Sequence, residues 1–203
     1  MARFKGFYAA ALVLAIALLS LGSSSANAAP TVLCKVEESP CPKASKWENR
    51  SFEASAAGAD FLMGMSGTIE CKSSILKGTL GAANEPQVVA IEGFTFSECK
   101  RGMETCKVKV AKLGGLNLLR TGPNSGEATL ASTEITTECG LAIDCKFEGS
   151  PVSELFGKNA VNNASFRFLE VALTKVGGAA CPATKLTSWY GILTPLPVYI
   201  QSP

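Results

Sequence analysis

The stretch that decides the fold runs from Gly67 to Val110. It reads GTIECKSS at residues 67–74, VVAIEGFTFSEC at 88–99 and KRGMETCKVKV at 100–110. Runs rich in β-branched and aromatic residues alternate with breaks that contain glycine, and cysteines stand at the ends of the runs. This pattern is typical of a β-domain that is cross-linked by disulfides in an oxidising, extracellular compartment.

The same alternation of apolar runs and glycine-containing breaks continues along the chain. About ten short strands, with turn signals roughly every dozen residues, predict an all-β fold, an antiparallel β-sandwich with a β-barrel as the alternative. The apolar positions change phase near Glu92 and Gly93, and again between Phe168 and Val171. A change of phase within a strand predicts a β-bulge at each place. Residues 153–163 are the one segment in which we expect a helical turn.

Residues 1–28 have the features of a secretory signal peptide. Arg3 and Lys5 precede an apolar run, and Ala26-Asn27-Ala28 supplies a small-x-small cleavage site. The apolar run is shorter than the roughly 20 residues that a spanning helix needs. We therefore expect residues 29–203 to be a single secreted domain that is not stably inserted in a membrane.

The charge of the mature chain argues against one class of partner. The full chain has 19 basic and 17 acidic residues. Cleavage of the signal peptide would remove Arg3 and Lys5, so that the mature chain would have equal numbers of basic and acidic residues and no net charge. Nucleic-acid-binding domains carry a basic excess. We expect no nucleic-acid partner.

The cysteines predict four disulfides, because all eight lie outside the signal peptide. Spacing favours three short loops and one long one. The predicted pairs are Cys34 with Cys41, Cys99 with Cys106, Cys139 with Cys145, and Cys71 with Cys181.

Several of these motifs occur together in a group of proteins. TIEC at 68–71 with KSS, FTFS before Cys99 and the spacing to Cys106, CPAT from Cys181 with TSWY at 187–190, and PLPVYI at 195–200 resemble uncharacterised secreted, cysteine-paired all-β proteins of bacteria. The resemblance implies an exported β-domain in a bacterial setting. It implies no catalytic residues.

Chemistry that depends on histidine is excluded, because the chain has no histidine. No Cys-x2-Cys knuckle is present, so we expect no metal and no cofactor. Ser74 and Ser97 each precede a lysine by three residues, as in penicillin-recognising enzymes, but the companion motifs are missing and we interpret both as surface serines at strand ends. A pair among the 15 glutamates could serve a glycoside hydrolase, which stays an alternative.

Lys100 and Arg101 lie between Cys99 and Cys106 and form the candidate binding loop. If these two cysteines were joined, the ring would display both cations, as in a secreted protease inhibitor, since a rigid loop loses little entropy on binding. With Lys107, Lys109, Lys112 and Arg120 nearby, the loop could instead hold an acidic cell-wall polymer. The plainer interpretation is a hairpin whose lysines keep a strand edge soluble.

The aromatic residues Trp47, Trp189, Tyr190 and Tyr199 could line a carbohydrate-binding face, although large aromatics in β-domains are more often core. No catalytic set emerges from the sequence. We therefore predict a secreted, non-enzymatic structural or binding protein of the cell exterior, whose partner is a cell-wall polymer or another secreted protein.

Overall fold

The computed structural model describes residues 31–63, 67–83, 87–141, 143–178 and 181–203, and the predicted signal peptide lies outside these residues. Almost all of the regular structure is strand. The strands are β1 (Val32–Cys34), β2 (Ser51–Ala56), β3 (Ala59–Leu62), β4 (Thr68–Cys71), β5 (Ser73–Leu80), β6 (Val88–Ser97), β7 (Lys100–Arg101), β8 (Glu104–Lys112), β9 (Leu116–Gly122), β10 (Ser125–Leu130), β11 (Thr133–Cys139), β12 (Ile143–Gly149), β13 (Val152–Phe156), β14 (Ser165–Gly177), β15 (Thr184–Thr194) and β16 (Tyr199–Gln201). A single 3-10 turn, η1, covers Lys43–Ser45.

The strands form an antiparallel meander that closes on itself. Short breaks divide several long strands into two labelled pieces, such as β2 with β3 and β12 with β13. Each long strand pairs with the next one along the chain, and β15 pairs back onto β2 and β3. The prediction of an all-β antiparallel fold with four disulfides is confirmed, and of the two arrangements considered, the strand order closes as in a barrel.

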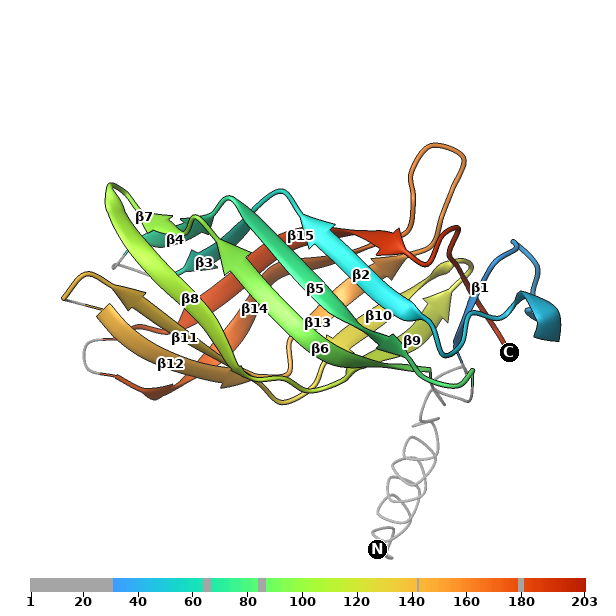
Figure 1. The fold of residues 1–203 in the computed structure, drawn as a ribbon, viewed down its shortest axis with the longest axis horizontal. Coiled ribbons are helices and arrows are strands. Elements are labelled where there is room, and N and C mark those ends of the chain that lie inside the picture. Colours follow the sequence, from blue (N-terminus) through green and yellow to red (C-terminus); the bar gives the residue numbers. More distant parts are fainter. Residues whose placement is uncertain (1–30, 64–66, 84–86, 142, 179–180) are drawn as a thin grey trace, which may run out of the picture.

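The barrel is elongated, and its two ends differ (Figure 1). At one end, β1 and β16 pair with each other as a separate two-stranded sheet. Leu33 and Ile200 of these strands are fully buried and belong to the main core. The other end carries β7, β8, β11 and β12 (Figure 1).

Both predicted bulges are confirmed. The register of β5 with β6 shifts opposite Glu92, and the register of β14 with β15 shifts between Phe168 and Val171. Glu170 in the second bulge has a φ of 48°. The helical turn expected in residues 153–163 is wrong, because this segment begins in strand β13, where Ser153 and Leu155 point inward and are buried. Strand β13 pairs with β14 on one side and with β10 on the other.

The predicted disulfide pairing is correct only for Cys34–Cys41. The other three bridges join Cys71 to Cys99, Cys106 to Cys139, and Cys145 to Cys181. The first two of these connect neighbouring long strands at the end of the barrel that carries β7, and the third joins β12 to the segment between β14 and β15.

The predicted Cys99–Cys106 ring is wrong, because each of these cysteines is bonded to a cysteine of the neighbouring long strand on its outer side. The backbone N–H of Cys106 donates a 2.8 Å hydrogen bond to the carbonyl of Cys99, so the two face each other at a hydrogen-bonded, wider position of the hairpin. Cys71 and Cys139 lie closer on the outer sides of that hairpin, with Cα–Cα distances of 3.8 Å to Cys99 and 4.2 Å to Cys106.

Aromatic side chains fill the interior, and Tyr190 lies among them. Its ring stacks on Phe166, with centroids 4.9 Å apart, and meets Phe94 and Phe168 edge to face. The Tyr190 hydroxyl and the Ser74 hydroxyl share a 2.6 Å hydrogen bond. Ser74 is therefore a buried partner of the core, and the interpretation of this serine as a surface residue is wrong.

The buried Tyr190 makes stability depend on alkaline pH. Desolvation raises the pKa of its phenol from 10.0 to about 12. The unfolded chain therefore loses this proton first, and stability falls as pH rises between about 10 and 12, by about 1.4 kcal/mol per pH unit. Urea titrations from pH 8 to 11.5 should show a shallower decline in Tyr190→Phe than in the parent. Equal declines in the two proteins would contradict the assignment.

Candidate functional site

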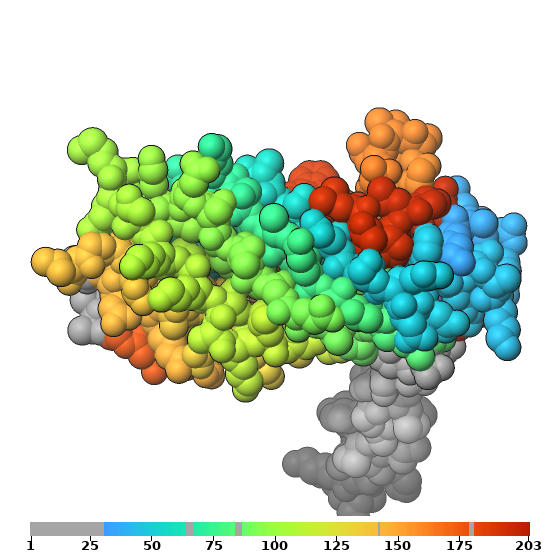
Figure 2. Space-filling model, in the orientation of Figure 1, coloured from blue at the N-terminus to red at the C-terminus, as the bar shows by residue number. Residues whose placement is uncertain are grey.

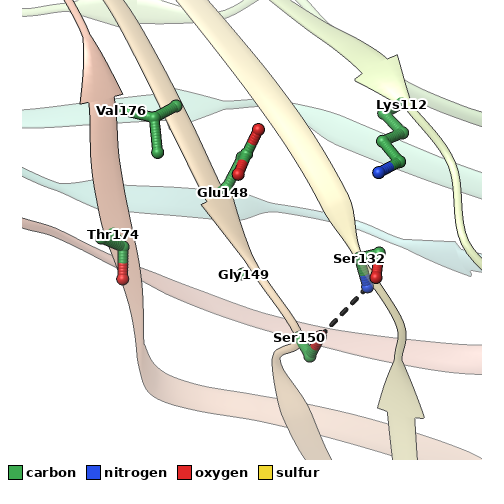
Figure 3. Close-up of a pocket in the computed structure, with 7 residues that line it drawn as sticks. All are labelled: Lys112, Ser132, Glu148, Gly149, Ser150, Thr174 and Val176. Carbon is green, nitrogen blue, oxygen red and sulfur yellow. Dashed lines mark hydrogen bonds between the residues drawn. The ribbon is translucent and has the colours of Figure 1, made fainter.

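Three shallow depressions on the surface of the described residues are candidate sites. The first lies on the outer wall where β8, β11, β12 and β14 come together, with a volume of about 340 Å³. Lys112 and Glu148 extend over it from different strands, and the Ser132 backbone N–H donates a 3.0 Å hydrogen bond to the Ser150 hydroxyl (Figure 3).

Glu134, beside this first depression, does not suit the general-acid role of a hydrolase. Glu134 lies opposite Glu148 in the β11–β12 register. A hydrogen bond from Lys146, with a 2.9 Å ion pair, lowers the pKa of Glu134 and raises the pKa of Lys146. The general acid of a glycoside hydrolase needs a carboxyl group with a raised pKa. Glu134 and Lys146 therefore form an ion pair on the outer wall, and the carboxylate of Glu148 lies on the neighbouring strand beside them.

The Ser-x-x-Lys motifs do not form catalytic pairs either. Residues three apart on a strand point to opposite faces. Ser74 points into the core, whereas Lys77 lies outside and pairs with Glu53 at 3.2 Å. The Ser97 hydroxyl is bonded to the Ser73 hydroxyl at 2.7 Å.

The second depression lies beside the candidate loop and is lined in part by Lys100 and Gly102. Gly102 has a φ of 61° and is the first central residue of a two-residue hairpin turn, the position where a type II′ turn needs glycine. The guanidinium of Arg101 pairs with Glu104 at 2.6 Å. Arg101 is thus held along the hairpin, while the fully exposed residue at the tip is Met103.

The lysines of the suggested patch near this loop are partly balanced by acids. Lys109 pairs with Glu138 at 3.7 Å, and Lys72 pairs with Glu98 at 3.2 Å. In the β8–β11 register, Lys107 lies opposite Glu138 and Lys112 opposite Glu134. Binding of a protease or a polymer by this hairpin stays a prediction, and the geometry gives it little support.

The third depression, of about 400 Å³, lies at the end of the barrel that holds β1. We call it the Trp47 depression. The chain that forms it belongs to the blue segment at one end of the space-filling view (Figure 2). Its lining residues are Lys35, Lys43, Ala44, Lys46, Trp47, Glu48, Asn49 and Arg50.

Disulfide and backbone contacts hold the Trp47 depression in shape. Cys34–Cys41 closes a small loop, and the Lys35 N–H donates a 2.8 Å hydrogen bond to the carbonyl of Ser45. The Trp47 indole N–H donates a 2.7 Å hydrogen bond to the carbonyl of Pro197, and its backbone N–H donates one of 2.8 Å to Leu33. The ring is therefore fixed at both its backbone and its edge.

Cations without ion-pair partners in the described chain line this depression. The ammonium of Lys35 lies 4.9 Å from the centroid of the Trp47 ring, within the range of a cation–π interaction. None of the ion pairs in the described chain involves Lys35, Lys43, Lys46 or Arg50. The acidic residue of the lining, Glu48, accepts a 3.2 Å hydrogen bond from the backbone N–H of Ala83. The depression thus joins a fixed aromatic ring to a local excess of positive charge.

The structure separates the four aromatic residues that the sequence grouped. Tyr190 is core, Trp47 and Tyr199 are half-buried, and Trp189 is exposed on the outer wall. The sequence did not reveal the cation cluster, because Glu37, Glu38 and Glu48 lie in the same stretch and nearly cancel its net charge. The signal that was present is a tryptophan flanked by basic residues just after a closely spaced cysteine pair.

Within the described ranges, no helix is long and apolar enough to cross a membrane. Nor do the described residues contain a group of three or more acidic or cysteine side chains placed to hold a metal ion. No protein-family model, curated protein or solved structure matches the chain. The resemblance to secreted bacterial proteins therefore stays a prediction, and function is argued from geometry.

Proposed function

We propose that this chain is a non-enzymatic binding protein of the cell exterior, and that the Trp47 depression holds an acidic polymer. The observation that carries the proposal is one depression lined by a fixed tryptophan and by four cations that have no ion-pair partner in the described chain, one of which, Lys35, lies over the ring. A polymer with one anionic group per repeat can place successive charges against successive lysines. The sugar or glycerol between those charges can pack on the indole.

Two further features support this function. Four disulfides fit an oxidising compartment, and the pattern of residues 1–28 directs the chain out of the cell. Four of the eight lining residues are cations, and one is a carboxylate. Recognition of an anion, rather than its conversion, is the chemistry that these side chains favour.

Binding can be measured on the mature chain with Trp189 replaced by phenylalanine, so that Trp47 is the remaining tryptophan. Polygalacturonate, which carries carboxylates, and poly(glycerol phosphate), which carries phosphodiesters, are the two probes. We expect a saturable change in Trp47 fluorescence that weakens with added salt. The probe that binds more tightly identifies the anionic group, and neutral dextran should give no change.

The substitutions Lys35→Gln, Lys43→Gln and Lys46→Gln together should weaken binding by about tenfold or more, since each exposed charge pair contributes up to about 1 kcal/mol. The matched control is Lys107→Gln, Lys109→Gln and Lys112→Gln, which removes the same charge from β8. Equal losses in the two triple variants would mean that only net charge matters. That result would overturn the proposed site.

A further inference from the structure

A second exposed feature lies on the outer wall, where β13, β14 and β15 run side by side (Figure 1). Glu154 lies opposite Arg167 in the β13–β14 register, and Arg167 lies opposite Trp189 in the β14–β15 register. Phe156 follows Glu154 by two residues and so points to the same face. We call these four residues the Trp189 platform.

The arginine holds the platform together. Its guanidinium carbon lies 5.6 Å from the centroid of the Trp189 ring and 5.8 Å from that of Phe156. Arg167 also donates two hydrogen bonds to one carboxylate oxygen of Glu154, the bond from Nε being 3.0 Å long. Two aromatic rings are thus fixed on either side of a neutralised cation.

Trp189 stays exposed in spite of these contacts. It keeps 58% of its surface accessible, and Phe156 keeps 37%. The two rings and the Arg167–Glu154 pair beside them therefore form an exposed surface with both apolar and polar groups that a ligand can reach.

The polar groups of the platform indicate what the ligand carries. The charges of Arg167 and Glu154 cancel, so an anion gains little there. Arg167 has five N–H donors, of which the described contacts use two, and the other carboxylate oxygen of Glu154 accepts no hydrogen bond in the described chain. The indole N–H of Trp189 donates none there either. Hydroxyl groups, which both donate and accept, match this set.

There is also room for a ring beside the indole. Gly191 follows Trp189 by two residues on the same face, and a Cβ added at Gly191 would meet nothing within 4 Å. Its φ is outside the left-handed region, so a larger residue can be introduced without backbone strain. Gly191 itself lies roughly 6.5 Å along the strand from Trp189.

We propose that the Trp189 platform binds an uncharged pyranose unit of a polysaccharide. The apolar C–H face of the sugar packs on the indole, and its hydroxyls bond to the free donors and acceptor of Arg167 and Glu154. The site shares no residue with the Trp47 depression, so each can be tested without the other.

Calorimetry of the mature chain with cellohexaose, chitohexaose and mannohexaose tests the proposal. We expect at least one to bind saturably, and Trp189→Ala to weaken it by about tenfold or more, as expected for an aromatic anchor. Gly191→Leu should cause a similar loss by filling the space beside the ring. Leu193→Ala, an exposed apolar residue further along β15, should leave affinity within about twofold.

The location of the ligand is read independently from fluorescence. In the Trp47→Phe chain, Trp189 is the remaining tryptophan, and its emission should shift to shorter wavelength as the sugar is added. Lys35→Gln, Lys43→Gln and Lys46→Gln together should not change sugar binding, even if they abolish binding of acidic polymers. No saturable binding of any of the three sugars, or binding unaffected by Trp189→Ala, would overturn the platform. A loss of unfolding free energy alone in Trp189→Ala would assign the ring to sheet stability.

Discussion

Replacing Tyr190 with alanine is expected to lower the free energy of unfolding by about 3–5 kcal/mol, the range for removal of a large buried aromatic side chain. Tyr190 is fully buried and contacts three phenylalanine rings. These rings come from β6 and β14, so the cavity would lie between strands that are distant in sequence. Urea unfolding with the disulfides intact gives the measurement.

Tyr190→Phe separates the ring from its hydroxyl. This substitution should cost about 1–3 kcal/mol, because it leaves the buried hydroxyl of Ser74 without the partner it has at 2.6 Å. Adding Ser74→Ala should recover part of the loss, since both polar partners are then gone. A loss below about 1 kcal/mol in Tyr190→Ala would contradict the central place of this residue in the core.

The local features of the fold could be predicted because they depend on neighbouring residues. Alternation of apolar and polar residues indicates strands whichever partner they find. Both bulges were visible as changes of phase, since inserting one residue moves every later side chain to the other face. The burial of Tyr190 follows from the same alternation, because Leu186 and Ile192 have the same parity and are buried with it.

Features that depend on strand order could not be predicted in the same way. Cys106 is seven residues from Cys99 and 33 from its true partner Cys139, and only the β8–β11 register brings the latter pair together. The Trp47 depression likewise needs Pro197, near the other end of the described chain, to fix the indole. Sequence distance carries no information about either contact.

The exposed position of Trp189 follows from the alternation in strand β15, although composition alone does not indicate it. Trp189 and Tyr190 are adjacent, so one of them had to face outward from strand β15. Composition favours burial of either one. Alternation with Leu186 and Ile192 assigns Tyr190 to the interior, and the tryptophan follows from that choice.

Removing the Cys106–Cys139 bridge by Cys106→Ala and Cys139→Ala is expected to cost about 3–4 kcal/mol. In the chain-entropy description, the cost grows with the loop that the bridge closes in the unfolded chain, and here the separation is 33 residues. The matched control is Cys34→Ala with Cys41→Ala, whose separation of 7 predicts only about 2 kcal/mol. Urea unfolding under non-reducing conditions gives both values. Equal losses would contradict the dependence on loop length.

The connectivity itself can be read from a tryptic digest of the denatured, unreduced mature chain. Trypsin cuts after Lys100, Arg101 and Lys107, and so separates Cys99 from Cys106. The pairing in the structure predicts peptide 51–72 linked to 78–100, and peptides 102–107, 121–146 and 176–185 linked as one species. The pairing expected from spacing would instead link 78–100 to 102–107 and 51–72 to 176–185, and would release 121–146 alone with an internal Cys139–Cys145 bridge. Finding the second set of peptides would mean that the closed strand order is held without bridges between strands at this end, and Cys106→Ala with Cys139→Ala would then open two short loops instead of the one of separation 33.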